Sequence, residues 1–139
     1  MISKKYNISS IEKLSSVALE LLTLSDNRIF ALYGEMGVGK TTLVKQFCDH
    51  LKIVDSVSSP TFSLVNEYIN CDGNTIFHFD LYRVDNVDEL IKIGIDSYLN
   101  SGNYCFIEWP NLLEPLLKAN YTAIKMIEDI NKRELYLLE

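Results

Sequence analysis

The segment that most constrains the fold is the glycine-rich run GEMGVGKT at residues 34–41. It matches the phosphate-binding loop pattern GxxxxGK[ST] at every specified position. It lies between a short apolar run, residues 28–33, and a segment in which apolar residues recur at helical spacing as far as Leu51. This order predicts strand, loop and helix, so that backbone N–H groups and the positive end of the helix face one anion.

The residue types of this loop predict how a triphosphate is held. The glycines let the backbone curl close to oxygen atoms that a Cβ would obstruct. Lys40 is expected to reach the β and γ phosphates, Thr41 to offer its hydroxyl to Mg²⁺, and Thr42 to contact the α phosphate. The predicted residues for ATP or ADP are Gly34, Glu35, Met36, Gly37, Val38, Gly39, Lys40, Thr41 and Thr42. A glycine-rich turn whose lysine points into solvent is the alternative interpretation.

Two carboxylates at the ends of apolar runs are candidates for the metal side of this site. Asp80 follows residues 76–79, and Glu108 follows residues 104–107. A nucleotide-bound Mg²⁺ usually takes its remaining ligands from carboxylates and water. Because ligands of parallel sheets bind at the carboxyl ends of strands, both carboxylates are expected to converge with the loop. Either could instead cap a turn or pair with Arg83.

The other segments predict an α/β fold. Strands that alternate with helices favour a P-loop NTPase-like three-layer sandwich, with a mainly parallel sheet and antiparallel hairpin additions. With 139 residues the chain has the size of one domain, so residues 1–139 are predicted to form a single P-loop domain. Before the loop, a helix is predicted over 10–24, opened by a capping box of Ser9 and Glu12. After the helical segment that follows the loop, an antiparallel hairpin of 63–69 and 75–83 is predicted, then one or two helices in 85–99 broken near Gly94. A strand over 103–109, a short helix in 110–117, and strands 122–127 and 134–138 joined by a turn near Asn131 complete the chain.

Composition narrows the range of functions. No stretch approaches the roughly 18 to 20 apolar residues of a membrane span, and no signal peptide is visible, so a cytoplasmic protein without membrane contact is expected.

Cys48, Cys71 and Cys105 fit neither a disulfide framework nor a zinc pattern and are expected to be reduced, buried and structural. The net charge is −6, with the acidic excess in residues 61–139, which disfavours direct nucleic-acid binding and leaves room for a protein partner with a basic surface.

Four blocks, in order over about residues 5–110, together resemble the TsaE (YjeE) family of bacterial ATPases needed to make threonylcarbamoyladenosine in tRNA. They are GEMGVGKTT at the loop, SPTF at 59–62 with NEY at 66–68, HFDLYR at 78–83, and Glu108-Trp109. The resemblance implies a Mg-dependent, slow ATPase that supports TsaD- and TsaB-like transferase subunits as they modify adenosine 37. It implies that tRNA is met only indirectly, through that complex.

The same resemblance implies roles for individual residues. Thr61 would sense the nucleotide near the γ phosphate, although a turn residue after Pro60 is the simpler interpretation of the sequence alone. Asp80 would organise Thr61 and the magnesium shell, and Glu108 would bind magnesium or orient the attacking water. The implied catalytic set is thus Thr61, Asp80 and Glu108, and the implied metal set is Thr41, Asp80 and Glu108.

The resemblance also implies positions for residues outside these two sets. Trp109 would lie beside the site, and Ser9 or Ser10 would lie near the adenine. After Trp109 the sequence departs from the family pattern, because the run PNLL lacks the charged residue expected soon after the proline. Arg133 is the one arginine in the C-terminal third that is left to approach the nucleotide.

Two other function classes stay open at this level. A small-molecule kinase of the nucleotide type needs several arginines and a lid, whereas this chain has Arg28, Arg83 and Arg133 and no lid-like insertion. A nucleotide-gated binding module would bind without useful hydrolysis. The shortage of arginines predicts slow hydrolysis by the isolated chain, because an arginine finger contributes about 10³ to 10⁵ in rate where one exists.

Overall fold

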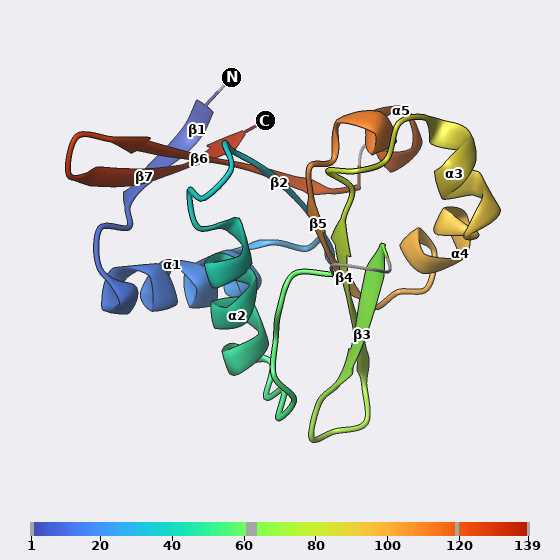
Figure 1. Ribbon diagram of the computed structural model, residues 1–139. Helices are drawn as coiled ribbons and strands as arrows, with labels where there is room; N and C mark the ends of the chain where they lie inside the picture. The colour runs from blue at the N-terminus through green and yellow to red at the C-terminus, as the bar shows by residue number, and fades with distance from the viewer. Residues whose placement is uncertain (1, 61–63, 119, 139) are drawn as a thin grey trace.

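A mixed sheet of seven strands runs through the computed structural model in the order β1-β7-β6-β2-β5-β4-β3 (Figure 1). The structure describes residues 2–60, 64–118 and 120–138. The strands are β1 (Ile2–Asn7), β2 (Ile29–Tyr33), β3 (Val65–Ile69), β4 (Thr75–Asp80), β5 (Tyr104–Glu108), β6 (Thr122–Asp129) and β7 (Lys132–Leu138). The helices are α1 (Ile11–Leu24), α2 (Lys40–His50), α3 (Val87–Lys92), α4 (Ile95–Leu99), the 3-10 turn η1 (Asn111–Leu113) and α5 (Glu114–Leu117).

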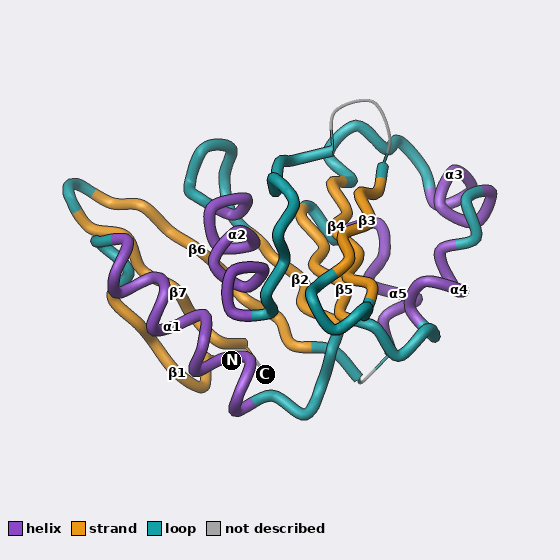
Figure 2. The backbone as a smooth tube through the Cα atoms, turned by 90° about the horizontal axis from the view of Figure 1, so that it is seen from below, coloured by secondary structure: helices purple, strands orange, loops and turns teal. Residues whose placement is uncertain are grey.

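The centre of the sheet is parallel and its edges are antiparallel. Strands β6, β2, β5 and β4 run parallel to one another. β3 pairs antiparallel with β4 at one edge, and β7 and β1 continue antiparallel from β6 at the other. Figure 2 shows β1, β7 and β6 on one side of β2 and β5, β4 and β3 on the other, with α3 and α4 beyond them. The predicted fold class, with its parallel core and antiparallel additions, is confirmed.

Helices cover the two faces of the sheet in separate groups. Because side chains alternate across a strand, Phe30 and Leu32 of β2 face α1 and α2, whereas Ala31 faces the side of α3, α4 and α5. The first cluster contains stacked rings: the centroids of Phe47 and Phe106 are 4.7 Å apart, and those of Phe30 and Phe106 are 5.5 Å apart. This aromatic packing fixes α2 against the centre of the sheet.

Strand β1 was not predicted. Its sequence, ISKKYN, is mostly exposed in the structure and has no apolar face to mark it. It is an edge strand that pairs only with β7, and lysines on such an edge discourage pairing with other chains. Its position follows from backbone pairing with residues more than a hundred positions away, which no local pattern records.

The predicted capping box of α1 is wrong by one residue. The helix is capped by Ser10, whose side-chain oxygen accepts a hydrogen bond from the Lys13 amide at 3.2 Å. The hydroxyl of Ser9 instead accepts from the Arg133 amide of β7 at 3.3 Å. Contact with the sheet therefore takes Ser9 away from the helix end, and the next serine replaces it.

The remaining predicted elements have the predicted type. α3 and α4 are separated at Gly94, which has a left-handed φ of 75°, and the β6–β7 turn passes through Asn131 at φ 63°. The strand predicted over 75–83 is shorter in the structure and ends at Asp80. None of the helices within the described ranges is both long enough and apolar enough to cross a bilayer.

The cysteines differ in burial. Cys48 and Cys105 are buried, and burial raises the pKa of each thiol to about 12. Cys71, in the turn between β3 and β4, is exposed. The prediction of a buried structural role is therefore confirmed for two cysteines and wrong for Cys71, because a hairpin turn offers no core to pack into.

Candidate functional site

The glycine-rich loop joins the end of β2 to the start of α2. A Cβ on Gly34 would lie 2.8 Å from Cγ1 of Val38 and 3.0 Å from the carbonyl oxygen of Met126, so the chain passes too close to β6 for any side chain. Gly39 precedes α2 as its N-cap, in the left-handed region at φ 111°. Close packing thus requires a glycine at position 34, and backbone conformation favours a glycine at position 39. The free N–H groups at the start of α2 lie at the loop.

Lys40 points into this loop. It is 4 % exposed, and its Nζ donates a hydrogen bond to the carbonyl oxygen of Gly34. The same nitrogen lies 3.6 Å from the ring centroid of Trp109. Burial lowers the pKa of Lys40, while the nearby carboxylates, Glu108 foremost, act in the opposite direction. The alternative of a lysine that faces solvent is therefore wrong.

Glu108 occupies the tip of β5 beside the start of α2. Its side chain is 4 % exposed. The hydroxyl of Thr41 donates to both carboxylate oxygens, at 3.1 Å and 2.9 Å, and Nε2 of His78 lies 2.7 Å from one of them. A buried carboxylate is thus bound directly to the loop hydroxyl that was expected to serve a metal.

Asp80 ends β4 and lies directly opposite Glu108 in the parallel register of β4 and β5. One of its oxygens accepts from the Ser59 hydroxyl at 2.7 Å, and the other accepts from the Tyr82 amide at 3.0 Å. The turn-capping interpretation of Asp80 is therefore correct for one oxygen. The expected convergence of Gly34, Asp80 and Glu108 at neighbouring strand ends is also confirmed.

Sequence reasoning missed the side chains that hold Glu108. His78 is 0 % exposed and lies between Glu108 and the hydroxyl of Tyr68, which is 3.2 Å from its Nδ1. The sequence places His78 in the HFDLYR block and in the apolar run before Asp80, and neither assigns it a role. A signal was present, because a residue two positions before Asp80 in a strand must share its face of the sheet. An imidazole in an otherwise apolar strand marks a hydrogen-bonded partner nearby.

Other predicted residues take different positions around the loop. Thr61 lies outside the described residues. Met36 is 63 % exposed on the outer side of the loop, and Val38 is buried beneath it. Trp109 lies beside the site, as expected, at a left-handed φ of 55°. A guanidinium nitrogen of Arg133 is 3.7 Å from the position that a Cβ on Gly39 would occupy, so this arginine does reach the loop.

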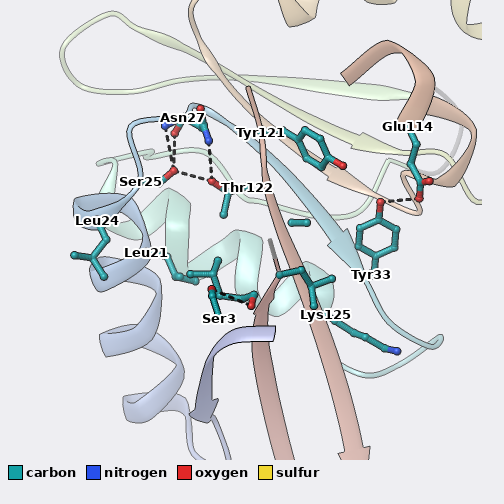
Figure 3. Close-up of a pocket in the computed structure, with 13 residues that line it drawn as sticks. Ser3, Leu21, Leu24, Ser25, Asn27, Tyr33, Glu114, Tyr121, Thr122 and Lys125 are labelled. Atoms are coloured by element: carbon teal, nitrogen blue, oxygen red, sulfur yellow. Dashed lines mark hydrogen bonds between the residues drawn. The ribbon is translucent and has the colours of Figure 1, made fainter. Parts of the chain in front are cut away.

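Two cavities lie near β6. One, of about 570 Å³, adjoins the loop between Gly34, Trp109 and Met126. The other, of about 770 Å³, is the β6 cavity drawn in Figure 3. At one end of it the Tyr33 hydroxyl donates to Glu114 at 2.7 Å, and at the other the hydroxyls of Ser25 and Thr122 are 2.7 Å apart. Of the predicted nucleotide residues, none lines the β6 cavity.

The donor set at the loop fits a magnesium nucleotide. Within the described ranges, no three His, Cys, Asp or Glu side chains are grouped so as to hold a metal by themselves. Mg²⁺ is usually held by one or two carboxylates together with phosphate oxygens and water rather than by a protein cage. Thr41 and Glu108 could supply that partial shell with Asp80 nearby. The loop before α2, with the buried Lys40 turned into it and the N–H groups of the first helical turn beside it, offers the anion side.

Comparison with known proteins gives a consistent result. The family model described as "Threonylcarbamoyl adenosine biosynthesis protein TsaE" matches residues 8–135. The chain is 40 % identical over 98 residues to the tRNA threonylcarbamoyladenosine biosynthesis protein TsaE of Haemophilus influenzae, which covers 70 % of this chain and 61 % of that protein. It is 34 % identical over 138 residues to the protein of the same name from Rickettsia conorii, with 92 % and 74 % covered.

A solved structure has the same fold. The crystal structure of Bacillus subtilis YdiB superposes with a TM-score of 0.73 at 25 % identity, over 99 % of this chain and 86 % of that one. The matched region spans less than two thirds of the Haemophilus influenzae relative's own length. The family model nevertheless extends from the start of α1 through the loop, both carboxylates and most of the β6–β7 hairpin. By this match, the chain belongs to the TsaE family.

Proposed function

We propose that this protein is a Mg-dependent ATP-binding protein and slow ATPase, and that it supports a threonylcarbamoyl transferase complex modifying adenosine 37 of tRNA. The observation that carries the proposal is the buried Lys40 turned into the loop, next to a buried Glu108 bound to the Thr41 hydroxyl. The relatives are named for threonylcarbamoyladenosine biosynthesis. TsaD- and TsaB-like subunits are the proposed partners, in the cytoplasm, and tRNA is met only through them.

The chain's own residues suggest how ATP is held. Backbone N–H groups of the loop and of the first turn of α2 surround the phosphates, and the helix dipole adds to their attraction. Lys40 leaves the Gly34 carbonyl and the face of Trp109 for the β and γ phosphate oxygens. Thr41 and Glu108 would hold Mg²⁺ with Asp80 nearby, and a bound Mg²⁺ would supply positive charge next to the phosphates.

The distribution of arginines supports slow turnover. The guanidinium carbon of Arg28 lies 5.0 Å from the ring centroid of Tyr104. Tyr104 is the first residue of β5, whereas Glu108 is the last. Arg133 lies beside Gly39, on the β6–β7 side of the loop, and its side chain is 45 % exposed. Arg28 is engaged with Tyr104 and Arg133 is partly exposed, so neither is expected to act as an arginine finger in the isolated chain. A partner that completes the site would therefore raise the hydrolysis rate. The acidic second half of the chain suits a partner with a basic surface.

Titration calorimetry with Mg·ATP tests the proposal. Lys40→Ala should weaken binding about 100-fold or more, because it removes a buried charge that faces the phosphates. Lys45→Ala is the matched control, since Lys45 is exposed on the same helix and should bind as the wild type does. Unchanged affinity in Lys40→Ala, or no nucleotide binding by the wild type, would refute the proposal.

The partner is tested separately. The protein immobilised with ATP or with ADP should retain a transferase pair from a bacterial lysate, and the addition of that pair should raise phosphate release. Hydrolysis that is equally fast with and without the pair would contradict the idea that the isolated site is incomplete.

A further inference from the structure

A chain of hydrogen bonds, buried at its centre and part-buried at its two ends, runs from the segment before β3 to the start of α2. The Tyr68 hydroxyl of β3 lies 3.0 Å from the Ser58 carbonyl oxygen and 3.2 Å from Nδ1 of His78 on β4. Nε2 of His78 lies 2.7 Å from Glu108 on β5, and Glu108 accepts from the Thr41 hydroxyl on α2. The segment at Ser58, β3, β4, β5 and α2 are thus linked in series, and Glu108 is the link between the sheet and α2.

We propose that His78 and Tyr68 are positioning residues for Glu108, and that through them the orientation of this carboxylate depends on where the segment at Ser58 lies. This inference rests on the proposed function, because it assigns Glu108 to the metal side of a nucleotide site. It adds two residues that touch neither nucleotide nor metal and act through Glu108.

Burial argues that these polar groups serve orientation rather than packing. His78 is 0 % exposed and Tyr68 is 4 % exposed, beside the apolar residues Ile76 and Phe106. An apolar side chain of similar size would fill the same space, whereas a buried imidazole or hydroxyl costs free energy unless it is hydrogen-bonded. Burial also raises the pKa of Tyr68, so its hydroxyl remains a neutral donor.

The geometry leaves Glu108 little freedom to turn. His78 holds one oxygen from the side of the sheet, and Thr41 holds the carboxylate from the side of α2. A ligand carboxylate that is held in this way presents its remaining lone pairs in one direction. Partners of this kind typically change metal affinity or activity by 10- to 100-fold when they are removed.

The neighbouring serine attaches the same segment to the second carboxylate. The Ser59 hydroxyl donates to Asp80 at 2.7 Å, while the Ser58 carbonyl is held by Tyr68 and by the amide of Asn66 at 3.0 Å. Two consecutive residues therefore hold Glu108 indirectly and Asp80 directly. A displacement of residues 58–59 would remove the Ser59 hydrogen bond from Asp80 and the Ser58 acceptor from the Tyr68 hydroxyl that supports His78, so the conformation of this segment is coupled to the orientation of both carboxylates.

A matched pair of substitutions at His78 separates positioning from packing. Glutamine places an amide nitrogen where the ring carries Nε2, so His78→Gln keeps the bond to Glu108. Asparagine places its amide where the ring carries Nδ1, so His78→Asn keeps the contact with Tyr68 and loses Glu108. Both remove the ring from the same core position. Because asparagine is one methylene shorter, the packing loss of each variant is measured by its thermal unfolding, and the dependence of affinity on Mg²⁺ reports the position of Glu108.

The measurement is the affinity for ADP by calorimetry, with Mg²⁺ and with a chelator, alongside thermal unfolding. The ratio of the two affinities should fall about 10- to 100-fold in His78→Asn and stay near the wild-type value in His78→Gln. The affinity without Mg²⁺ should be unchanged in both. Equal ratios in the two variants would overturn the inference even if both lose stability.

Tyr68→Phe provides a second test in case the histidine variants fail to fold. It removes the one hydroxyl that joins Ser58 to His78, and the Mg²⁺ ratio should fall about 2- to 10-fold. Tyr104→Phe is the control, because Tyr104 packs against the hydrophobic cluster that contains Tyr68 but is not part of the hydrogen-bond chain. Identical behaviour of the two phenylalanine variants would overturn the inference. A wild type that binds no nucleotide would instead refute the proposed function, and this inference with it.

Discussion

The two ends of the sheet differ in how far they bury their ionisable side chains. Around the tips of β4 and β5, Glu108 and His78 are buried and bonded to each other. Along the antiparallel edge formed by β1, β7 and β6, Lys5 and Glu134 also form a 2.7 Å pair, but Lys5 is largely exposed. Exposed pairs contribute little to stability, whereas buried charges are costly unless their partners are in place. The difference is that Glu108 is held in place by buried partners, whereas Lys5 of the edge pair faces water.

The largest expected effect concerns stability. Phe106→Ala should lower the free energy of unfolding by about 3 to 5 kcal/mol, because it removes a fully buried ring from the stack with Phe30 and Phe47. Ile127→Ala, on the antiparallel edge and partly exposed, should cost less than about 1 kcal/mol. Urea unfolding of both variants measures the difference, and similar losses would contradict a core concentrated at the parallel strands.

The same chemical change at the two ends should have different effects on activity. Glu108→Gln keeps the shape of the side chain but removes its charge, and phosphate release should fall about 10- to 100-fold. Glu134→Gln removes an exposed partner of Lys5 and should leave phosphate release as it is. If Glu108→Gln released phosphate at the wild-type rate, the site would fit the nucleotide-gated binding module better than an ATPase.

Two glycines, one in the loop after β2 and one in the β3–β4 turn, should also differ in their effects. In Gly34→Ala the new methyl group meets Val38 and the Met126 carbonyl, so we expect a loss of about 1 to 3 kcal/mol together with weaker nucleotide binding. Gly73, in the turn between β3 and β4, has open space around it at a left-handed φ of 82°. Gly73→Ala should cost about 1 kcal/mol of strain and leave affinity intact. Thermal unfolding and ADP titration distinguish the two outcomes.

The smallest effect concerns the one arginine that connects the antiparallel edge to the loop. Arg133 is near Gly39 but its side chain is 45 % exposed, so Arg133→Ala should weaken ADP binding by no more than about 5-fold. Lys132→Ala, one residue earlier and exposed, is the control for net charge. If the two variants bind ADP equally, the edge contributes to the site only through its packing against Gly34.

Local patterns were sufficient for the parts of the molecule that a short segment specifies by itself. The loop motif between an apolar run and a helical repeat predicted β2, the loop and α2. The carboxylates that end two apolar strands predicted the convergence of Asp80 and Glu108. Both inferences succeed because parallel strands with covered faces are recognisable as apolar runs and because their carboxyl ends must share one edge of the sheet.

What the sequence determined on its own was therefore the P-loop, the parallel centre and the two carboxylates, since each depends on residues that are neighbours along the chain. Contacts between distant parts of the folded chain select Ser10 rather than Ser9 as the cap of α1, add β1 to the sheet, and connect Ser58 to Glu108 through Tyr68 and His78. These contacts join residues that are 10 to more than 100 positions apart. Their partners are selected by strand register and packing, and no local pattern carries that information.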